Sequence, residues 1–129
     1  RRSAANRWTT MFRSRAVFAE SPPKRALDGL LGLGLSLRHP VGGTIQAFSR
    51  AGEEIRIGSE EQGVAFLMAG NGLSLWLAED HDLFVSVQPP GVLVAYFDGW
   101  TADEQSDLLS RLLRAGYAPR VEGEEDASY

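Results

Sequence analysis

The chain of 129 residues contains no cysteine, which excludes disulfide bonds, thiolate zinc sites, iron–sulfur clusters and a cysteine nucleophile. It has two histidines, too few to build a transition-metal site without other nitrogen or sulfur ligands. The G-x-S-x-G, H-E-x-x-H and P-loop patterns are missing. No residue stands out as a nucleophile or general base. We therefore expect no catalytic residue, no metal and no cofactor, and the sequence argues against an enzyme.

Long apolar runs are also absent. The stretch GVLVAYF at 91–97 is far shorter than the roughly 20 residues that a transmembrane helix requires. We expect a protein without a membrane association, located in the cytoplasm. Nearly all the basic residues are arginine, which suits a bacterial source with a high-GC genome.

The composition is that of an ordinary globular domain, with 43% hydrophobic and 23% charged residues. The net charge is −4, but basic residues gather near the start of the chain and acidic residues at its end. We divide the chain into a basic arm (1–11), one α+β domain (12–119) and an acidic tail (120–129). A basic arm can bind phosphates, but short charged termini are usually solvated, so nucleic acid is not the expected partner.

Helices are predicted on both sides of a strand-rich region. After a strand at 12–19, Ser21 is placed as an N-cap in front of a proline, and apolar residues follow at helical spacing. The last helix is predicted at 102–115, with a capping box formed by Thr101 and Glu104. Its apolar stripe and the glycine expected just beyond its end are Leu108, Leu109, Leu112, Leu113 and Gly116.

Between the helices, short apolar runs alternate with turn residues. Asn71-Gly72 is predicted to form a type I′ hairpin turn. Such short spacings favour antiparallel neighbours. The fold class is therefore α+β, an antiparallel meander sheet of about six to seven strands with two helices packed on one face, in the order β-α-β6-α. The six central strands are predicted at 44–49, 53–58, 63–69, 72–78, 83–88 and 91–97.

Several of these strands are apolar on both faces. Leu73, Leu75 and Leu77 share one face, while Trp76 and Ala78 lie on the other. Either the strands are covered on both sides within one chain, or the second face contacts a ligand or partner. Trp100, directly before the capping Thr101, is expected to hold the last helix against the sheet.

The segment AEDHD at 78–82 is the most polar connection between the predicted strands. Four consecutive residues rarely converge on one metal ion, so a polar hairpin turn is favoured over a metal or acid/base site. An aromatic residue beside carboxylates is typical of a protein-binding surface. We predict a partner-binding site for a basic protein, made of Trp76, Glu79, Asp80 and Asp82.

Two other motifs are only partial matches to known enzyme and cofactor-binding patterns. SPPK at 21–24 has the S-x-x-K spacing of penicillin-binding enzymes, but the companion motifs are absent. GLGLS at 32–36 lacks the third glycine of a dinucleotide-binding loop.

Two functional hypotheses follow. The first is a non-catalytic protein-interaction module, such as an inhibitor, an immunity protein or an adaptor. The second is a binder of a small apolar ligand, because the element order over residues 12–116 resembles the helix-grip architecture of START and Bet v 1 proteins. That resemblance implies a sheet wrapped around the last helix and an apolar cavity between them.

Overall fold

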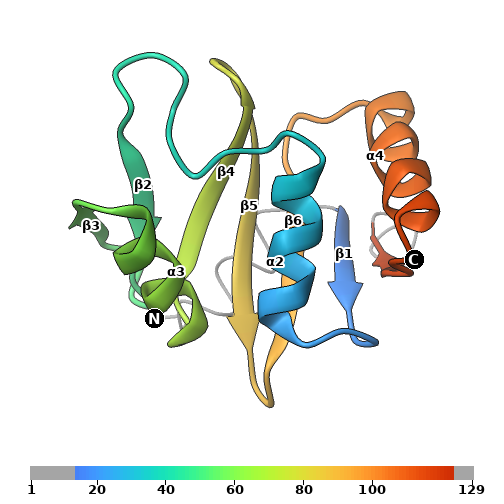
Figure 1. Cartoon of the computed structure of the whole chain (residues 1–129), viewed down its shortest axis with the longest axis horizontal. Coiled ribbons are helices and arrows are strands. Elements are labelled where there is room, and N and C mark those ends of the chain that lie inside the picture. Colours follow the sequence, from blue (N-terminus) through green and yellow to red (C-terminus); the bar gives the residue numbers. More distant parts are fainter. Residues whose placement is uncertain (1–13, 124–129) are drawn as a thin grey trace.

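The computed structural model describes residues 14–123, which form a single antiparallel sheet with helices packed against it (Figure 1). The α+β class and the sheet of about seven strands are confirmed. The predicted arm at 1–11 and the last residues of the tail lie outside the described residues. The elements are β1 (Ser14–Phe18), α2 (Pro23–Gly32), β2 (Ile45–Phe48), β3 (Glu54–Ile57), α3 (Glu60–Met68), β4 (Gly72–Ala78), β5 (His81–Gln88), β6 (Val92–Phe97), α4 (Ala102–Arg114) and β7 (Arg120–Glu122).

The strand order in the sheet is β3-β2-β4-β5-β6-β1-β7. Strands β4, β5 and β6 follow one another as a meander, whereas β1 lies between β6 and β7. Strand β2 pairs with only the first residues of β4. Beyond that point the chain after α2 lies between them, since Ser36 bridges to Trp76 of β4 and Arg38 bridges to Ile45 of β2. This insertion fixes the segment after α2 beside the end of β4.

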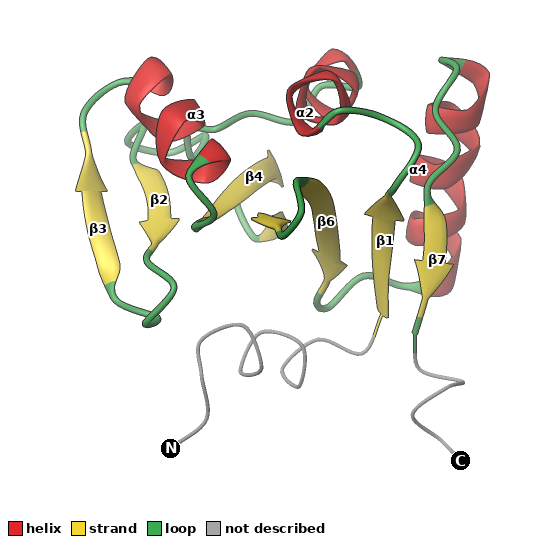
Figure 2. Ribbon diagram, turned by 90° about the horizontal axis from the view of Figure 1, so that it is seen from below, coloured by secondary structure: helices red, strands yellow, loops and turns green. Residues whose placement is uncertain are grey.

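All three described helices contribute to one core on one face of the sheet. Figure 2 shows α2 and α3 over the strands and α4 at the end of the sheet, beside β7. Alternation along the strands points one set of side chains towards the helices. Leu27 and Leu30 of α2, Leu67 of α3 and Leu112 of α4 are fully buried there. Strand residues that meet them include Phe18, Ala47, Leu73, Leu75, Leu83, Val85, Leu93 and Ala95.

The opposite face carries a second, smaller apolar cluster. Val17, Phe84, Val94 and Tyr96 are buried in it, and Phe48 packs against them. This set gives β1, β5 and β6 a second apolar face, whereas Trp76 of β4 is not part of it. Strands β1, β5 and β6 contribute to both clusters, so apolar residues occupy successive positions along them.

Helix α4 agrees closely with its prediction. Thr101 accepts a hydrogen bond from the Glu104 amide, and the Glu104 carboxylate accepts one from the Thr101 amide, so the capping box is present. Gly116 follows the helix with a φ of 96°. Trp100 is buried and packs on Phe97 of β6, and the Gln105 side-chain amide of α4 donates to the Trp100 carbonyl oxygen. The predicted stripe was too wide, because Leu113 is 66% exposed.

The strand predicted at 63–69 is wrong, because residues 60–68 form helix α3. Ser59 is its N-cap and accepts a hydrogen bond from the Gln62 amide. Glu60 and Glu61 occupy the first turn, where the helix dipole favours carboxylates. The central region therefore contains five strands and a helix in place of six strands.

The helix-grip resemblance depended on those six consecutive strands. Helix α3 interrupts them, and β2, which also pairs with β3, takes the place beside β4 that a simple meander would give to β3. The space between the sheet and the helices is occupied by the buried side chains of the core. The element order that suggested an apolar cavity is therefore absent.

Two predicted local features also differ. Ser21 is not the N-cap of α2: Pro22 takes that position, without a side-chain cap, so the helix begins one residue later. Asn71-Gly72 is not a hairpin turn but the connection from α3 to β4. The Asn71 side chain donates to the Phe66 carbonyl and accepts from the Arg50 amide, while Gly70 takes the positive φ that the turn requires.

Strand β7 was not predicted, because residues 120–129 were assigned to an acidic tail. Arg120–Glu122 pairs antiparallel with β1 at the edge of the sheet. An ion pair of 2.8 Å from Arg15 of β1 to Glu122 links this strand to the sheet, and Arg120 of β7 itself pairs with the same carboxylate at 2.7 Å. None of the described helices is long and apolar enough to span a membrane.

Candidate functional site

The AEDHD segment forms the hairpin between β4 and β5, and its turn is shorter than predicted. Only Glu79 and Asp80 lie in the turn, whereas His81 and Asp82 belong to β5. A bulge near Leu77 shifts the pairing, so that Trp76 lies opposite Asp82 and Ala78 lies opposite His81. The hairpin projects at the top of Figure 1, at the same end of the molecule as the start of α4.

The structure brings Trp76 and Asp82 together as register partners. Alternation puts both on the sheet face opposite the helices. Trp76 is only partly exposed, and its indole nitrogen is buried without a hydrogen-bond partner among the described residues. Glu79 and Asp80 are exposed in the turn beside this pair. The four predicted partner-binding residues therefore lie close together on one hairpin.

His39, from the segment after α2, connects that segment to the hairpin. Its ring lies edge-on to Trp76 at 4.4 Å, and Nε2 is 2.8 Å from the Glu79 carbonyl oxygen. Nδ1 is 2.8 Å from the Val41 carbonyl oxygen. A protonated ring can donate to both carbonyls. These contacts, the one at Val41 above all, raise the pKa of His39 above its ordinary value.

His81 points to the helix side of the sheet. Its ring stacks on Trp100 at 4.3 Å, and Nε2 lies 3.6 Å from a Glu104 carboxylate oxygen. The Trp100 indole N–H donates to the Asp82 carbonyl at 2.7 Å. The pKa of Glu104 is lowered, chiefly because its carboxylate accepts a hydrogen bond from the Thr101 amide. The hairpin and the start of α4 are thus held together by direct contacts.

This end of the molecule is rich in carboxylates, and we call it the acidic end. Asp98 follows β6, whose last residue pairs with Leu83 of β5, next to Asp82. Helix α4 then begins nearby with three further carboxylates. Asp103 and Asp107 make no ion pair with any residue in 14–123. The members of the acidic end are Glu79, Asp80, Asp82, Asp98, Asp103, Glu104 and Asp107.

A groove of about 230 Å³ lies between the start of α4, the end of β4 and the segment after α2. We call it the α4 groove. Its apolar wall includes Leu77, which is 45% exposed although it is a large hydrophobic residue. Its polar residues are Asp103, Glu104, Asp107 and Arg111, and its apolar ones are Leu33, Leu35, Leu77, Trp100 and Leu108.

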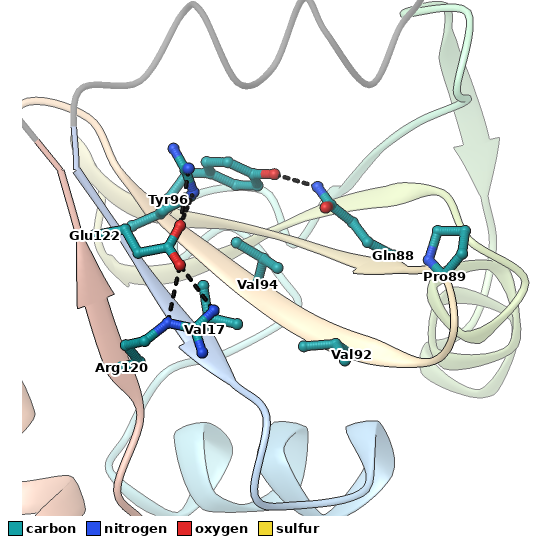
Figure 3. A pocket seen from close by; sticks show the side chains of 9 residues that line it. Val17, Gln88, Pro89, Val92, Val94, Tyr96, Arg120 and Glu122 are labelled. Atoms are coloured by element: carbon teal, nitrogen blue, oxygen red, sulfur yellow. Dashed lines mark hydrogen bonds and ion pairs between the residues drawn. The ribbon is translucent and has the colours of Figure 1, made fainter. Parts of the chain in front are cut away.

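A second pocket, of about 260 Å³, lies on the opposite face of the sheet near β7 (Figure 3). Two arginines line it, but both of them point to Glu122. The Glu122 carboxylate accepts from Arg15 Nε at 3.0 Å and from Arg120 Nε at 2.9 Å. The Gln88 amide also donates to the Tyr96 hydroxyl. Both arginines of this pocket are therefore already paired with a carboxylate of the protein itself.

The sequence favours a polar turn over a metal site at AEDHD. Within residues 14–123, no three His, Cys, Asp or Glu side chains are grouped so that they could hold a metal ion. His81 and Asp82 point to opposite faces of the sheet, which explains why neighbours in sequence do not converge here.

Comparison of the chain with models of known protein families, with curated protein sequences and with solved structures finds no match. Sequence reasoning missed the residues on α4, Asp103 and Asp107, and the apolar Leu77 beside the hairpin. The alternation of Leu73, Leu75 and Leu77 suggested a uniform buried face. Leu77 lies at the bulge of β4 and is exposed, whereas Leu73 and Leu75 are fully buried.

Proposed function

We propose that this protein is a non-catalytic interaction module that binds a basic protein partner through its acidic end. The hairpin residues Glu79, Asp80 and Asp82 meet the partner together with Trp76. Of the possible roles of such a module, inhibitor, immunity protein and adaptor all require this binding step.

The proposal depends on the composition of the acidic end. Seven carboxylates from the β4–β5 hairpin, the end of β6 and the start of α4 lie there with an exposed large hydrophobic residue, Leu77. Like charges gathered at one end of the molecule repel each other, and a partner of opposite charge relieves that repulsion. Protein interfaces combine apolar anchors with a polar rim, and complementary charge speeds the encounter.

The charge at this end also exceeds what the helix requires. Asp103 and Glu104 lie in the first turn of α4, where the helix dipole stabilises carboxylates. Glu79, Asp80 and Asp107 have no such structural explanation. Their presence beside Leu77 is consistent with a surface selected for binding.

The test is differential capture from extracts of the source organism. Immobilised wild-type protein is compared with Asp80→Asn/Asp82→Asn, and retained proteins are identified by mass spectrometry. We expect a basic protein that the wild type retains and the variant loses. Glu53→Gln/Glu54→Gln is the matched control, because these two exposed carboxylates lie at the start of β3, away from the hairpin.

The expected partner must be retained by the control as strongly as by the wild type. Equal retention by all three proteins, or loss with both variants, would contradict the proposal. Circular dichroism of each variant checks that the fold is unchanged.

A further inference from the structure

We infer that the α4 groove is the subsite that takes an arginine side chain of the basic partner. This inference rests on the proposed function, since it identifies which chemical group of that partner is recognised and where. It concerns Asp103 and Asp107 of α4 and Leu77 of β4, which the Asp80→Asn/Asp82→Asn variant leaves unchanged.

The size of the groove favours a single side chain. Its volume is about 230 Å³. Pockets for small molecules and cofactors usually hold about 300–1,000 Å³. The α4 groove is therefore small for a cofactor but suits one long side chain entering from another protein.

The lining separates into an apolar wall and a charged row. Leu77 and Leu108, with Trp100, supply the apolar wall. Asp103, Asp107 and Arg111 are four residues apart on α4, so they form one row along the helix, with about 6 Å of rise between successive members. The acidic residues come first and the arginine last.

Arg111 is the last residue of the row and makes its C-terminal end positive. Its Nη2 donates to the Leu33 carbonyl at 3.2 Å, so it is held against the segment after α2. An incoming cation is repelled by Arg111 and attracted by Asp103 and Asp107, which have no ion-pair partner among residues 14–123. The positive group of the ligand therefore lies towards the start of α4.

Arginine matches this lining better than lysine. Its aliphatic stem can cover Leu77 and Leu108 while its guanidinium group reaches the carboxylates. The planar guanidinium also forms paired hydrogen bonds with a carboxylate and stacks on aromatic rings, which the ammonium of lysine cannot do in the same way. We assign the carboxylate contacts to Asp103 and Asp107.

The test uses two capped tetrapeptides, acetyl-Ala-Leu-Arg-Ala-amide and the same peptide with Glu in place of Arg. Each is titrated into the full-length ¹⁵N-labelled protein and followed by NMR. We expect the arginine peptide to shift the indole N–H signal of Trp100 and the amides of Leu77 and Asp107. The glutamate peptide should leave these signals in place.

Variants locate the binding. Asp107→Asn should weaken binding of the arginine peptide about two- to fivefold, as expected for one exposed ion pair. Leu77→Ser should weaken it as well. Glu61→Gln, an exposed carboxylate in the first turn of α3, is the matched control and should bind like the wild type. Equal shifts with both peptides, shifts on another surface, or unchanged affinity in Asp107→Asn would overturn the inference.

Failure of this inference is distinguishable from failure of the proposed function. If Asp80→Asn/Asp82→Asn loses the captured partner while Asp107→Asn and Leu77→Ser retain it, the hairpin binds the partner and the α4 groove does not. If the arginine peptide binds the groove but the Asp80→Asn/Asp82→Asn variant retains every captured protein, the groove is an arginine-binding site and the hairpin proposal fails.

Discussion

His39 is the residue that joins the segment after α2 to the acidic hairpin. In the protonated ring, Nδ1 donates to the Val41 carbonyl and Nε2 to the Glu79 carbonyl, each at 2.8 Å. In the neutral ring, Nδ1 instead accepts from the Val41 amide at 3.0 Å. Deprotonation thus exchanges one partner of the ring for another and removes a charge beside Glu79.

We predict that NMR titration of the His39 ring gives a pKa above the ordinary 6.5, because the Val41 and Glu79 carbonyls favour the protonated form. The folded-state pKa is raised, so the resulting stabilisation is fully present below about pH 6.5 and is lost as the pH rises through the folded pKa. A titration midpoint at or below 6.5 would contradict these hydrogen bonds.

Two neighbouring leucines on α4 should behave in opposite ways. Leu112 is fully buried, whereas Leu113 is 66% exposed. Urea unfolding of Leu112→Ala should show a loss of at least about 2 kcal/mol, because truncation of a buried leucine leaves a cavity. Leu113→Ala is the matched control and should change the free energy of unfolding by less than about 0.5 kcal/mol. Similar losses in both variants would mean that the helix packs by another face.

At the scale of elements, α2 provides a matched pair of glycines. A Cβ at Gly29 would lie 2.6 Å from the Tyr117 ring, whereas a Cβ at Gly32 would meet nothing within 4 Å. Alanine is usually favoured over glycine in a helix by about 0.5–1 kcal/mol. We therefore predict that Gly29→Ala destabilises the protein and that Gly32→Ala leaves it unchanged or stabilises it, as measured by thermal unfolding. If both alanine variants gain stability, Tyr117 does not pack on Gly29 as described.

The helices differ in how far the sequence predicts them. Helix α4 is specified by local signals, namely the capping box of Thr101 and Glu104 and a glycine after its end. In α3 the run GVAFLMA is apolar at nearly every position, and such a short run does not distinguish a strand from a buried helix by its period. The decisive signal was Ser59 with acidic residues after it, which a strand interpretation treats as a separator.

The candidate site was predictable only in part, for a physical reason. The carboxylates of the hairpin are neighbours in sequence, so their proximity follows from a single turn. The α4 groove joins Leu33, Leu77 and Asp107, which are brought together only by packing of the helix layer on the sheet. The position of strand β7 was equally hard to predict, since Glu122 pairs with Arg15, which lies 107 positions away in the sequence. Charge pattern alone does not reveal such long-range pairs.

At the scale of the whole molecule, the edge formed by β7 should make stability depend on acid pH. Hydrogen bonds from Arg120, followed by the influence of Arg15, hold the pKa of Glu122 below its ordinary 4.5. A lowered folded-state pKa means that this stabilisation is present above about pH 4.5 and is lost as the pH falls through the folded pKa.

Glu122→Gln should therefore be less stable than the wild type at neutral pH, and the two should converge as the pH falls below the folded pKa of Glu122. Urea unfolding at a series of pH values measures this difference. Glu53→Gln, at the other end of the sheet order, is the control and should follow the wild type. A constant difference between wild type and Glu122→Gln at all pH values would exclude titration of this ion pair as the cause.

The central claim is that the acidic end binds a basic protein by charge. Titration calorimetry with the captured partner at low and high salt tests it most directly, with wild type, Asp80→Asn/Asp82→Asn and the Glu53→Gln/Glu54→Gln control measured side by side. We predict that wild type and control lose affinity equally as salt rises, and that the Asp80/Asp82 variant binds more weakly at low salt with a flatter salt dependence. Unchanged affinity of that variant at both salt concentrations would contradict the claim.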